Sequence, residues 1–282
     1  MRLGAHVSAA GGLVKSFDRA EDIGAETIQI FASSPRAWKF KVPLESDVSN
    51  FRTRLENVDV SPVYVHGSYL VNLAGNAELV KKSVSCLVET MNVSSQIGAA
   101  GVIFHLGSHG GIGFESVFGQ VVKALKYVLS ETDHGTSLII ENSAGMGNHI
   151  GSSFEEIGRL VNQVNDHRLN VCLDTEHAFA AGYDIVKEDG IKLVIKEFEN
   201  KIGISKLAVV HANDSKVEFG SGVDRHQNIG EGYIGIEGFK TIMSHDAFRE
   251  VPFILEVPGS DGSGPDKINM DRMKMIRNEI GI

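Results

Sequence analysis

The sequence predicts an α/β protein that folds as a single (β/α)8 TIM barrel over residues 1–282, with its active site at the C-terminal ends of the strands. Three observations predict this fold. Eight short apolar or β-branched runs recur along the chain, a longer segment follows each run, and no linker or low-complexity tract marks a domain boundary. Eight alternating units favour a parallel sheet closed into a barrel. An open doubly wound sheet is the alternative, but no GxGxxG motif follows the first run to support a dinucleotide site.

The predicted strands are nearly continuous hydrophobic stretches. This pattern is typical of strands that are buried on both faces, as in a parallel sheet covered by helices. The eight runs are LGAHVS (3–8), ETIQIFA (26–32), PVYVHG (62–67), GVIFHLG (101–107), SLIIEN (137–142), NVCLDT (170–175), KLAVVHAND (206–214) and PFILEV (252–257).

The segments between the strands carry helical patterning. In the segment 76–98, apolar residues recur at the spacing of an amphipathic helix, and Gly98 is a helix stop signal. The predicted helices are 12–24, 46–57, 76–98, 115–131, 153–165, 184–200, 236–246 and 265–279. The stretch 213–235 is too glycine-rich and polar for a strand or helix, and a loop of this length is expected to have a function.

Composition and chain length indicate an ordinary folded protein. The chain has 42% hydrophobic and 22% charged residues, as an ordinary soluble protein does. Its 282 residues are enough to bury a large core without oligomerisation, so we expect a monomer. No secretory signal and no apolar run of roughly 20 residues is present, so no membrane association is expected. Cys86 and Cys172 have no CxxC partner and are expected to be buried and reduced, which suits the cytoplasm.

Residues that bind metals follow the predicted strands. Side chains at the carboxyl ends of barrel strands converge on one face, where active sites form. Six of the eight runs supply such a residue there: His66, His105, Glu141, Asp174, His211 and Glu256. Three more are expected in loops on the same face: His177, Asp224 and His226.

Each of these residues alone has a simpler explanation. A single histidine at a strand end is more often structural than a ligand, Asp174 is placed to cap a following helix, and Asp224 suits a turn. Glu141 and Glu256 are harder to explain in this way, because each follows an apolar run and a buried carboxylate is costly unless it is paired or bound to a metal. Six strand ends that all carry such residues favour a metal site.

Five histidines and four carboxylates form a nitrogen and oxygen ligand set. This set suits zinc, manganese or iron better than calcium or magnesium. Nine ligands are too many for one ion, but a bridging carboxylate would let them hold three ions with open positions for water. The formal net charge of −9 argues against a broad basic surface for nucleic acid. Three divalent ions would add +6 and leave −3, with the positive charge concentrated in one cleft.

Several motifs together resemble endonuclease IV, the zinc-dependent apurinic/apyrimidinic endonuclease family of base excision repair. The resemblance runs in order from residue 4 to about residue 260. It is carried by GAHVSAAGG (4–12), HGSYLVNLA (66–74), ENSAGMG (141–147), LDTEHAFAAGYD (173–184), HANDSK (211–216), DRHQNIGEG (224–232) and LEVPG (255–259).

The resemblance implies a trinuclear zinc centre and a reaction. The first zinc would be held by His66, His105 and Glu141, and Glu141 would bridge to a second. The second would also take Asp174, His211 and Glu256, and the third His177, Asp224 and His226. A hydroxide between zinc ions would then attack the phosphate 5′ to an abasic site in double-stranded DNA and leave a 3′-hydroxyl. In this family the same site also trims blocked 3′ ends. Cleavage would therefore depend on Glu141.

The resemblance also suggests DNA contacts. The positions that match Arg36, Tyr69 and Leu70 would enter the DNA stack at the lesion and let the base-less nucleotide swing out. Trp38 has either a DNA role or the role of a packed loop anchor. Lys216 and Arg225 are expected to contact phosphates, unless they merely pair with a nearby carboxylate.

Four residues depart from the pattern expected for the family. Leu106 stands where proline is usual, Gln227 where histidine is common, and Val257 where threonine is usual. Glu176 adds a carboxylate between two expected ligands; we expect it to point away from them, and a competing contact with the metal site is the alternative. These changes bear on rate and metal preference more than on the type of reaction.

Two other functions are open at this stage. A sugar isomerase or epimerase would use a similar metal site on a related barrel, but such sites usually need fewer histidines and one or two ions. The third group of ligands, His177 with Asp224 and His226, therefore discriminates between the two. An inactive metal-stabilised DNA-binding protein would have lost some ligands, whereas all nine are present here.

Overall fold

The computed structural model describes residues 1–132 and 135–282, and its eight parallel strands close into a barrel. Around the barrel the strands run in the order β1, β2, β3, β4, β5, β6, β7 and β10, and every neighbouring pair is parallel. The (β/α)8 fold predicted from the sequence is confirmed. The barrel strands are β1 (Leu3–His6), β2 (Thr27–Ile30), β3 (Val63–His66), β4 (Gly101–Phe104), β5 (Ser137–Glu141), β6 (Leu169–Asp174), β7 (Leu207–His211) and β10 (Phe253–Leu255).

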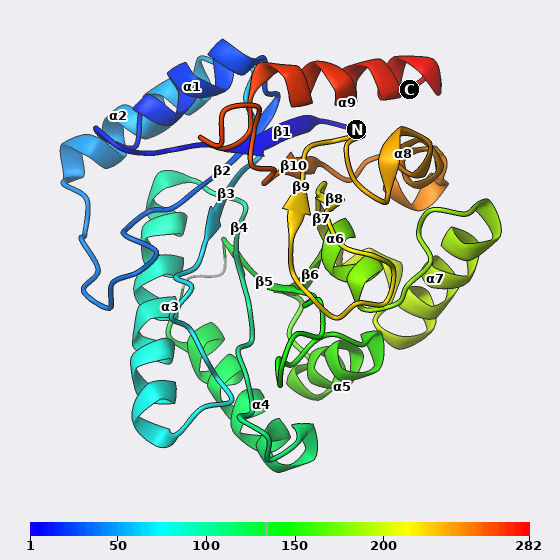
Figure 1. Cartoon of the computed structure of the whole chain (residues 1–282). Helices are drawn as coiled ribbons and strands as arrows, with labels where there is room; N and C mark the ends of the chain where they lie inside the picture. The colour runs from blue at the N-terminus through cyan, green and yellow to red at the C-terminus, as the bar shows by residue number, and fades with distance from the viewer. Residues whose placement is uncertain (133–134) are drawn as a thin grey trace.

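The helices form a ring around the strands, as Figure 1 shows. Both chain ends lie on the same side of this ring, beside α9. The helices are α1 (Lys15–Ile23), α2 (Glu45–Glu56), α3 (Ala77–Ile97), α4 (Phe114–Ser130), α5 (Phe154–Val164), α6 (Thr175–Ala180), α7 (Glu188–Lys201), α8 (Gly235–Ser244) and α9 (Lys267–Glu279), with short 3-10 turns η1 (Ile204–Lys206) and η2 (Asp246–Phe248).

Two apolar clusters explain why these strands and helices pack as they do. The larger cluster lies between the strands and the helix ring, where α3 contributes Leu87 and Met91 from its apolar face. The smaller cluster takes one residue from each of six strands and fills the inside of the barrel. Its members are Tyr64, Ile103, Ile139, Cys172, Val209 and Ile254. The barrel is therefore a packed core, and its chemistry is confined to the ends of the strands.

The predicted helix boundaries agree with the structure to within about two residues at most ends, because the capping signals are local. Asn76 accepts a hydrogen bond from the Leu79 amide at the start of α3, and Gly98 ends the helix in the left-handed conformation with φ 78°. Two starts were wrong. The helix predicted at 12–24 begins at Lys15, and the one predicted at 184–200 begins at Glu188, because turns precede both.

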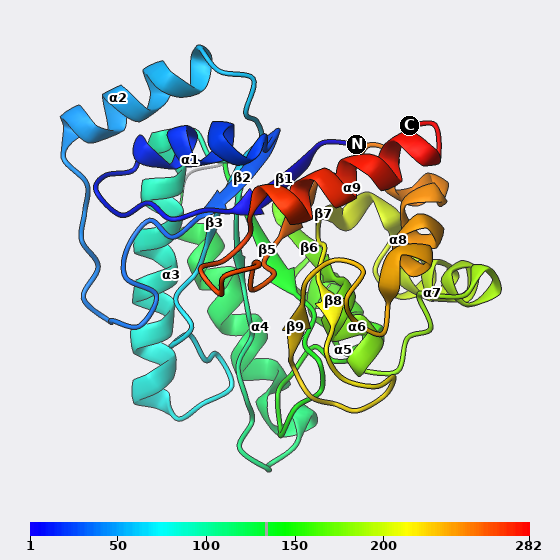
Figure 2. The same cartoon turned by 45° about the horizontal axis from the view of Figure 1, so that its top comes forward.

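The stretch 213–235 contains a small sheet that the sequence did not predict. β8 (Asp214–Ser215) pairs antiparallel with β9 (His226–Gln227), so the expectation that this stretch holds no strand is wrong. Two residues per strand are too few for a hydrophobic alternation to be visible in the sequence. The six-residue helix α6 was also missed, and it lies beside β8 (Figure 2).

Cys86 and Cys172 are buried free cysteines, as expected. In the described part of the chain, no helix combines the length and the apolarity that crossing a membrane requires.

The close approach of β1 and β2 gives a test of the barrel. A Cβ added at Gly4 would lie 1.8 Å from the Thr27 carbonyl oxygen, which is backbone and has no room to move. We expect Gly4→Ala to destabilise the protein by about 3 kcal/mol, measured as a lower midpoint of urea unfolding.

Gly119→Ala is the matched control, because a Cβ there meets nothing within 4 Å on the exposed side of α4. Its midpoint should stay the same or rise, since alanine favours a helix over glycine by roughly 0.5–1 kcal/mol. Equal midpoints for the two variants would contradict the close strand pairing.

Candidate metal centre

The structure gathers the nine expected ligand side chains at one end of the barrel. Three groups form there, and within each group the nitrogen and oxygen atoms that can bind a metal lie within 4.8 Å of one another. Each group combines imidazole nitrogens with carboxylate oxygens. The groups are His66, His105 and Glu141; then Glu141, Asp174, His211 and Glu256; and then Asp174, Glu176, His177 and His226.

Glu141 joins the first two groups, because its two oxygens face different histidines. Oε2 lies 3.2 Å from His66 Nε2 and 3.3 Å from His105 Nε2. Oε1 lies 3.0 Å from His211 Nδ1 and 3.4 Å from His177 Nδ1. Glu141 is the last residue of β5 and is only 1% exposed, so its position follows from the strand itself.

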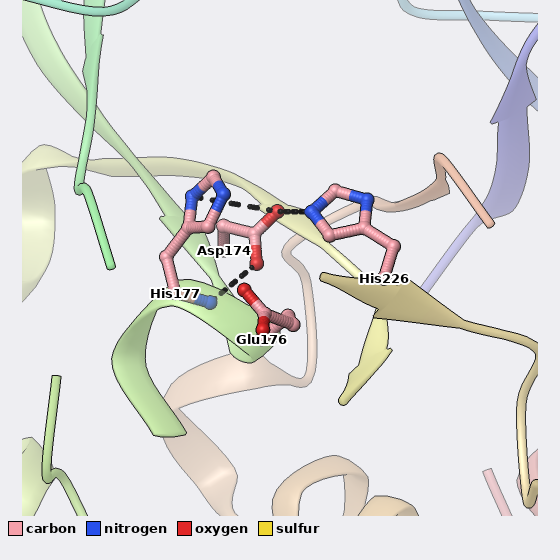
Figure 3. Close-up of side chains that lie close together, drawn as sticks. All are labelled: Asp174, Glu176, His177 and His226. Atoms are coloured by element: carbon pink, nitrogen blue, oxygen red, sulfur yellow. Dashed lines mark hydrogen bonds and ion pairs between the residues drawn. The ribbon is translucent and has the colours of Figure 1, made fainter. Parts of the chain in front are cut away.

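Asp174 joins the second and third groups. Its Oδ2 lies 3.8 Å from Nδ1 of both His177 and His211 and 3.7 Å from His226 Nε2. Its Oδ1 accepts a hydrogen bond from the His177 amide and so caps α6. Figure 3 shows the Asp174 carboxylate between the imidazoles of His177 and His226. Asp174 therefore caps a helix, which was the simpler explanation offered for it from the sequence, and it also belongs to the cluster.

Asp224 completes the surroundings of the third group. Its carboxylate lies 3.3 Å from His177 Nε2 and 3.5 Å from His226 Nε2. The prediction that the three late residues lie in loops was wrong for two of them. His177 lies in α6 and His226 in β9, whereas Asp224 is in the loop before β9. Neither element was predictable from the sequence pattern, because both are very short.

A single buried carboxylate, that of Asp214, holds the end of the stretch that carries Asp224 and His226. Asp214 lies at the start of β8 and accepts hydrogen bonds from backbone N–H groups across the turn that precedes α8. Four of these donors are Gly230, Gly232, Ile234 and Gly235, at 2.8–3.3 Å. Asp214 thereby ties the end of the long stretch to the strand end where the cluster lies.

The charges in the cluster stabilise one another. Burial raises the pKa of a carboxyl group, but His105 and His211 hold the pKa of Glu141 well below its usual value. Burial likewise opposes the charge on His177, yet Asp174 and Asp224 raise its pKa well above the usual value. The pKa shifts of Glu141 and His177 therefore favour the charged form of each group.

Backbone and amide groups orient the histidines. His66 Nδ1 donates to the Gly67 carbonyl at 2.8 Å, and His177 Nδ1 donates to the Asn142 carbonyl at 2.9 Å. In both rings this leaves Nε2 toward the carboxylates. His211 is reversed, because its Nε2 lies 2.9 Å from Gln29 Oε1 and its Nδ1 faces Glu141. Such outer contacts fix which nitrogen of each ring is able to bind a metal.

Sequence reasoning missed four polar residues that support the ligands. Gln29 Nε2 donates to Glu256 Oε1, and His6 Nδ1 lies 2.9 Å from the same oxygen. Asn213 Nδ2 donates to Asp174 Oδ2 at 2.7 Å, and the Asp174 amide donates to Asn142 Oδ1 at 2.7 Å. The signal was available for Gln29, since a polar residue in the buried strand TIQI requires a partner.

Glu176 lies closer to the ligands than predicted. The expectation that it points away is wrong, because one of its oxygens is within 4.8 Å of atoms of Asp174, His177 and His226. Burial and the neighbouring Asp174 raise the pKa of Glu176 to about 7.

The chain is similar to known proteins in both sequence and structure. Residues 17–279 match the family model described as xylose isomerase-like TIM barrel. A protein of Halothermothrix orenii named probable endonuclease 4 is 42% identical, over 94% of this chain and 96% of its own length. The crystal structure of endonuclease IV from Thermus thermophilus is 35% identical with a TM-score of 0.87, and the match covers 99% of this chain and all of that one.

The chain belongs to the endonuclease IV family. The resemblance seen in the sequence motifs is thus confirmed, and so is the enzyme class, an endonuclease. A D-tagatose 3-epimerase-like protein is also similar, with a TM-score of 0.72 over 99% of this chain and 97% of that chain, but at 20% identity. That likeness shows a shared fold and nothing about the reaction.

Three departures from the endonuclease IV pattern are accommodated by packing and hydrogen bonds. Leu106 is fully buried in the core, and its carbonyl accepts from the Leu73 amide at 2.9 Å. Val257 is buried, and Gln227 Oε1 accepts from the Asn228 amide.

A cleft of about 990 Å³ opens beside the cluster, and two of the expected DNA contacts line it with His226 and Glu256. These are Arg36 and Tyr69, which come from neighbouring loops joined by a hydrogen bond from the Tyr69 amide to the Pro35 carbonyl. Tyr69 is 54% exposed, and its ring lies 5.6 Å from that of His66.

The other expected DNA contacts are not part of this cleft lining. Leu70 is half-buried, and Lys216 and Arg225 are exposed. The Arg225 guanidinium donates to the Asp224 carbonyl at 2.8 Å. Trp38 packs against the hydrophobic core, which favours its reading as a loop anchor.

The donors present fit divalent metal ions. Imidazole nitrogens and carboxylate oxygens are ligands of zinc, manganese and iron, and carboxylates shared between groups suit closely spaced ions. Two buried atoms of the third group, His226 Nε2 and Glu176 Oε2, have no hydrogen-bond partner, which is costly unless a cation or water meets them. These two atoms are therefore available to a bound cation or water molecule.

Asp214→Ala tests how the stretch 213–235 is held. Its loss leaves several backbone N–H groups without acceptors, so we expect the free energy of unfolding to fall by about 2–4 kcal/mol. We also expect trypsin to cut faster after the exposed Lys216 and Arg225. Asp189→Ala, at an exposed position of α7, is the control. It should change neither the free energy of unfolding nor the rate of proteolysis. Unchanged proteolysis of Asp214→Ala would show that other contacts hold the stretch.

Proposed function

We propose that this protein is a DNA-repair endonuclease that hydrolyses the phosphodiester bond 5′ to abasic sites and leaves a 3′-hydroxyl. We also propose that it removes blocking groups from 3′ ends at the same site. The observation that carries this proposal is the joining of three donor groups by Glu141 and Asp174 at the mouth of the barrel, beside an open cleft. Membership of the endonuclease IV family supports the same reaction.

The proposed metal centre holds three zinc ions, with manganese or iron accepted at some positions. The nine proposed ligands fall into the groups described above, with Asp224 added to the third by its contacts with His177 and His226. When bound, such ions supply a nucleophile at neutral pH and stabilise charge on the attacking and leaving oxygens of a phosphodiester.

The protein's own contribution is to hold the ligands and orient them. The Gly67 and Asn142 carbonyls fix the tautomers of His66 and His177, and Gln29 fixes that of His211. Glu141 is held in place by the end of β5 and has both oxygens directed at imidazoles, so it is the residue on which the shape of the centre depends most. A preformed site of this kind needs little reorganisation when substrate arrives.

The cleft supplies candidate DNA contacts. Arg36 and Tyr69 line it next to the centre and are placed to enter a duplex at the lesion, with Leu70 beside them. Lys216 and Arg225 are proposed phosphate contacts on the exposed stretch before β9. The protein's net charge of −9 is compatible with DNA binding if the metal ions concentrate positive charge in the cleft.

A sugar isomerase or epimerase is the weaker candidate. Fold similarity alone supports it, at 20% identity for the epimerase-like structure. The third donor group favours the nuclease. It adds two histidines and a carboxylate, which a metal site that acts on a small sugar would not require. We further propose that the protein acts in the cytoplasm as a monomer, in keeping with its two buried free cysteines.

The direct test uses a labelled duplex that carries one tetrahydrofuran abasic analogue. We expect incision 5′ to the analogue, sensitivity to EDTA, and a 3′ end that a polymerase extends. We expect Glu141→Gln to lower the rate by roughly a hundred- to a thousandfold, because one oxygen of the joining carboxylate becomes an amide.

Glu188→Gln, at an exposed position of α7, is the matched control and should cut at the wild-type rate. Cleavage that survives EDTA, or near-normal turnover by Glu141→Gln, would overturn the proposal.

Tyr69→Ala tests the contact with the lesion. Loss of the exposed ring should weaken binding to abasic duplex by about 1–3 kcal/mol, the usual worth of one stacking contact, and weaken binding to undamaged duplex less. Fluorescence anisotropy of the metal-loaded protein, on duplexes in which a non-hydrolysable linkage blocks cleavage, measures both affinities. Tyr127→Ala, an exposed tyrosine of α4, is the control. An equal effect of Tyr69→Ala on both duplexes would remove its assignment as a wedge.

A further inference from the structure

Glu176 is the one member of the three donor groups that lies outside the nine proposed ligands. It belongs to α6, two residues after Asp174 and directly before His177. The side chain is fully buried, so its carboxylate has no access to bulk water. A carboxylate in such a position requires partners for both of its oxygens.

The two oxygens of Glu176 have different surroundings. Oε1 accepts hydrogen bonds from the Arg225 amide at 3.1 Å and from Ser215 Oγ at 3.3 Å. Oε2 is buried and has no partner. The first oxygen therefore anchors the chain segments around β8 and β9, and the second is left without any role in holding the fold.

One oxygen of the Glu176 carboxylate belongs to a group that suits a cation. The ligand atoms of Glu176, Asp174, His177 and His226 all lie within 4.8 Å of one another. Figure 3 shows the Glu176 carboxylate next to that of Asp174, with one oxygen directed toward it. No hydrogen bond joins these two carboxylates, and a positive ion between them would relieve the repulsion that acts when both are charged. His226 Nε2, in the same group, also lacks a hydrogen-bond partner.

We propose that Glu176 is an additional oxygen ligand of the third metal position, which Asp174, His177, Asp224 and His226 surround, and that it shifts this position toward oxygen-preferring ions such as manganese. The inference rests on the proposed metal centre. Zinc is usually bound by four ligands, often nitrogen atoms, whereas manganese favours a higher coordination number and oxygen ligands. A further carboxylate also adds negative charge, which a divalent ion neutralises.

Glu176→Gln separates this role from that of a structural anchor. The amide oxygen of glutamine still accepts from Ser215 and the Arg225 amide, so the fold around β8 and β9 is kept. The charge and the second oxygen are lost. Glu218→Gln is the matched control, since it makes the same chemical change on an exposed residue of the same stretch.

The experiment loads the metal-free full-length proteins from a buffer with equal free manganese and zinc, and counts bound ions by mass spectrometry. At one position per chain we expect Glu176→Gln to lower the ratio of manganese to zinc by about tenfold, with the other two positions unchanged. Glu218→Gln should match the wild type. An unchanged ratio in a folded Glu176→Gln protein would overturn the proposal.

A crystal structure of the manganese-loaded wild type gives an answer that needs no variant. Anomalous scattering locates the ion, and we expect a Glu176 oxygen at about 2.0–2.3 Å from it. An ion held by Asp174, His177 and His226 with Glu176 turned away would overturn this inference and leave the proposed function intact. No ion in any of the three groups would overturn both.

Discussion

The buried charge of Glu141 is the interaction on which the site depends. A carboxylate that is 1% exposed at the end of β5 is costly unless both of its oxygens have partners. Here His66 and His105 meet one oxygen, and His177 and His211 meet the other. The pKa values of His177 and His211 are raised well above the usual value, so these two imidazoles offset the charge of Glu141, and divalent ions bound between the same atoms would also offset it. The buried charge of Glu141 therefore accounts both for the stability of the histidine contacts around it and for the ability of this cluster to bind metal ions.

Short elements and buried polar side chains place the remaining ligands. Closure of the barrel brings strand ends that are far apart in sequence to one rim, and α6 and β9 then add His177 and His226 from outside the strands. Asp214 holds the turn between β9 and α8 by accepting hydrogen bonds from its backbone N–H groups. Gln29 holds His211 and Glu256 from inside the barrel. The ligands thus stand on a rigid frame, and the cleft beside them is open for a large substrate.

The sequence predicted the barrel because its strands are apolar throughout and its helices are amphipathic, and both patterns extend over many residues. It also predicted which strand ends carry the histidines and carboxylates that the structure brings together, since Glu141 and Glu256 follow apolar runs directly. It did not predict β8, β9 or α6, because two to six residues are too few for a periodic pattern. The direction of Glu176 was predicted wrongly, since it is set by tertiary contacts with Ser215 and the Arg225 backbone that no local pattern encodes.

The number of metal ions per chain tests the central claim most directly. The full-length protein, refolded or purified under metal-replete conditions and freed of loosely bound ions, is analysed by mass spectrometry against an accurate protein concentration. Three donor groups joined by Glu141 and Asp174 predict about three tightly bound divalent ions, mainly zinc. A well-folded sample that holds one ion or none would contradict the account, because the buried carboxylates would then be balanced by protons alone.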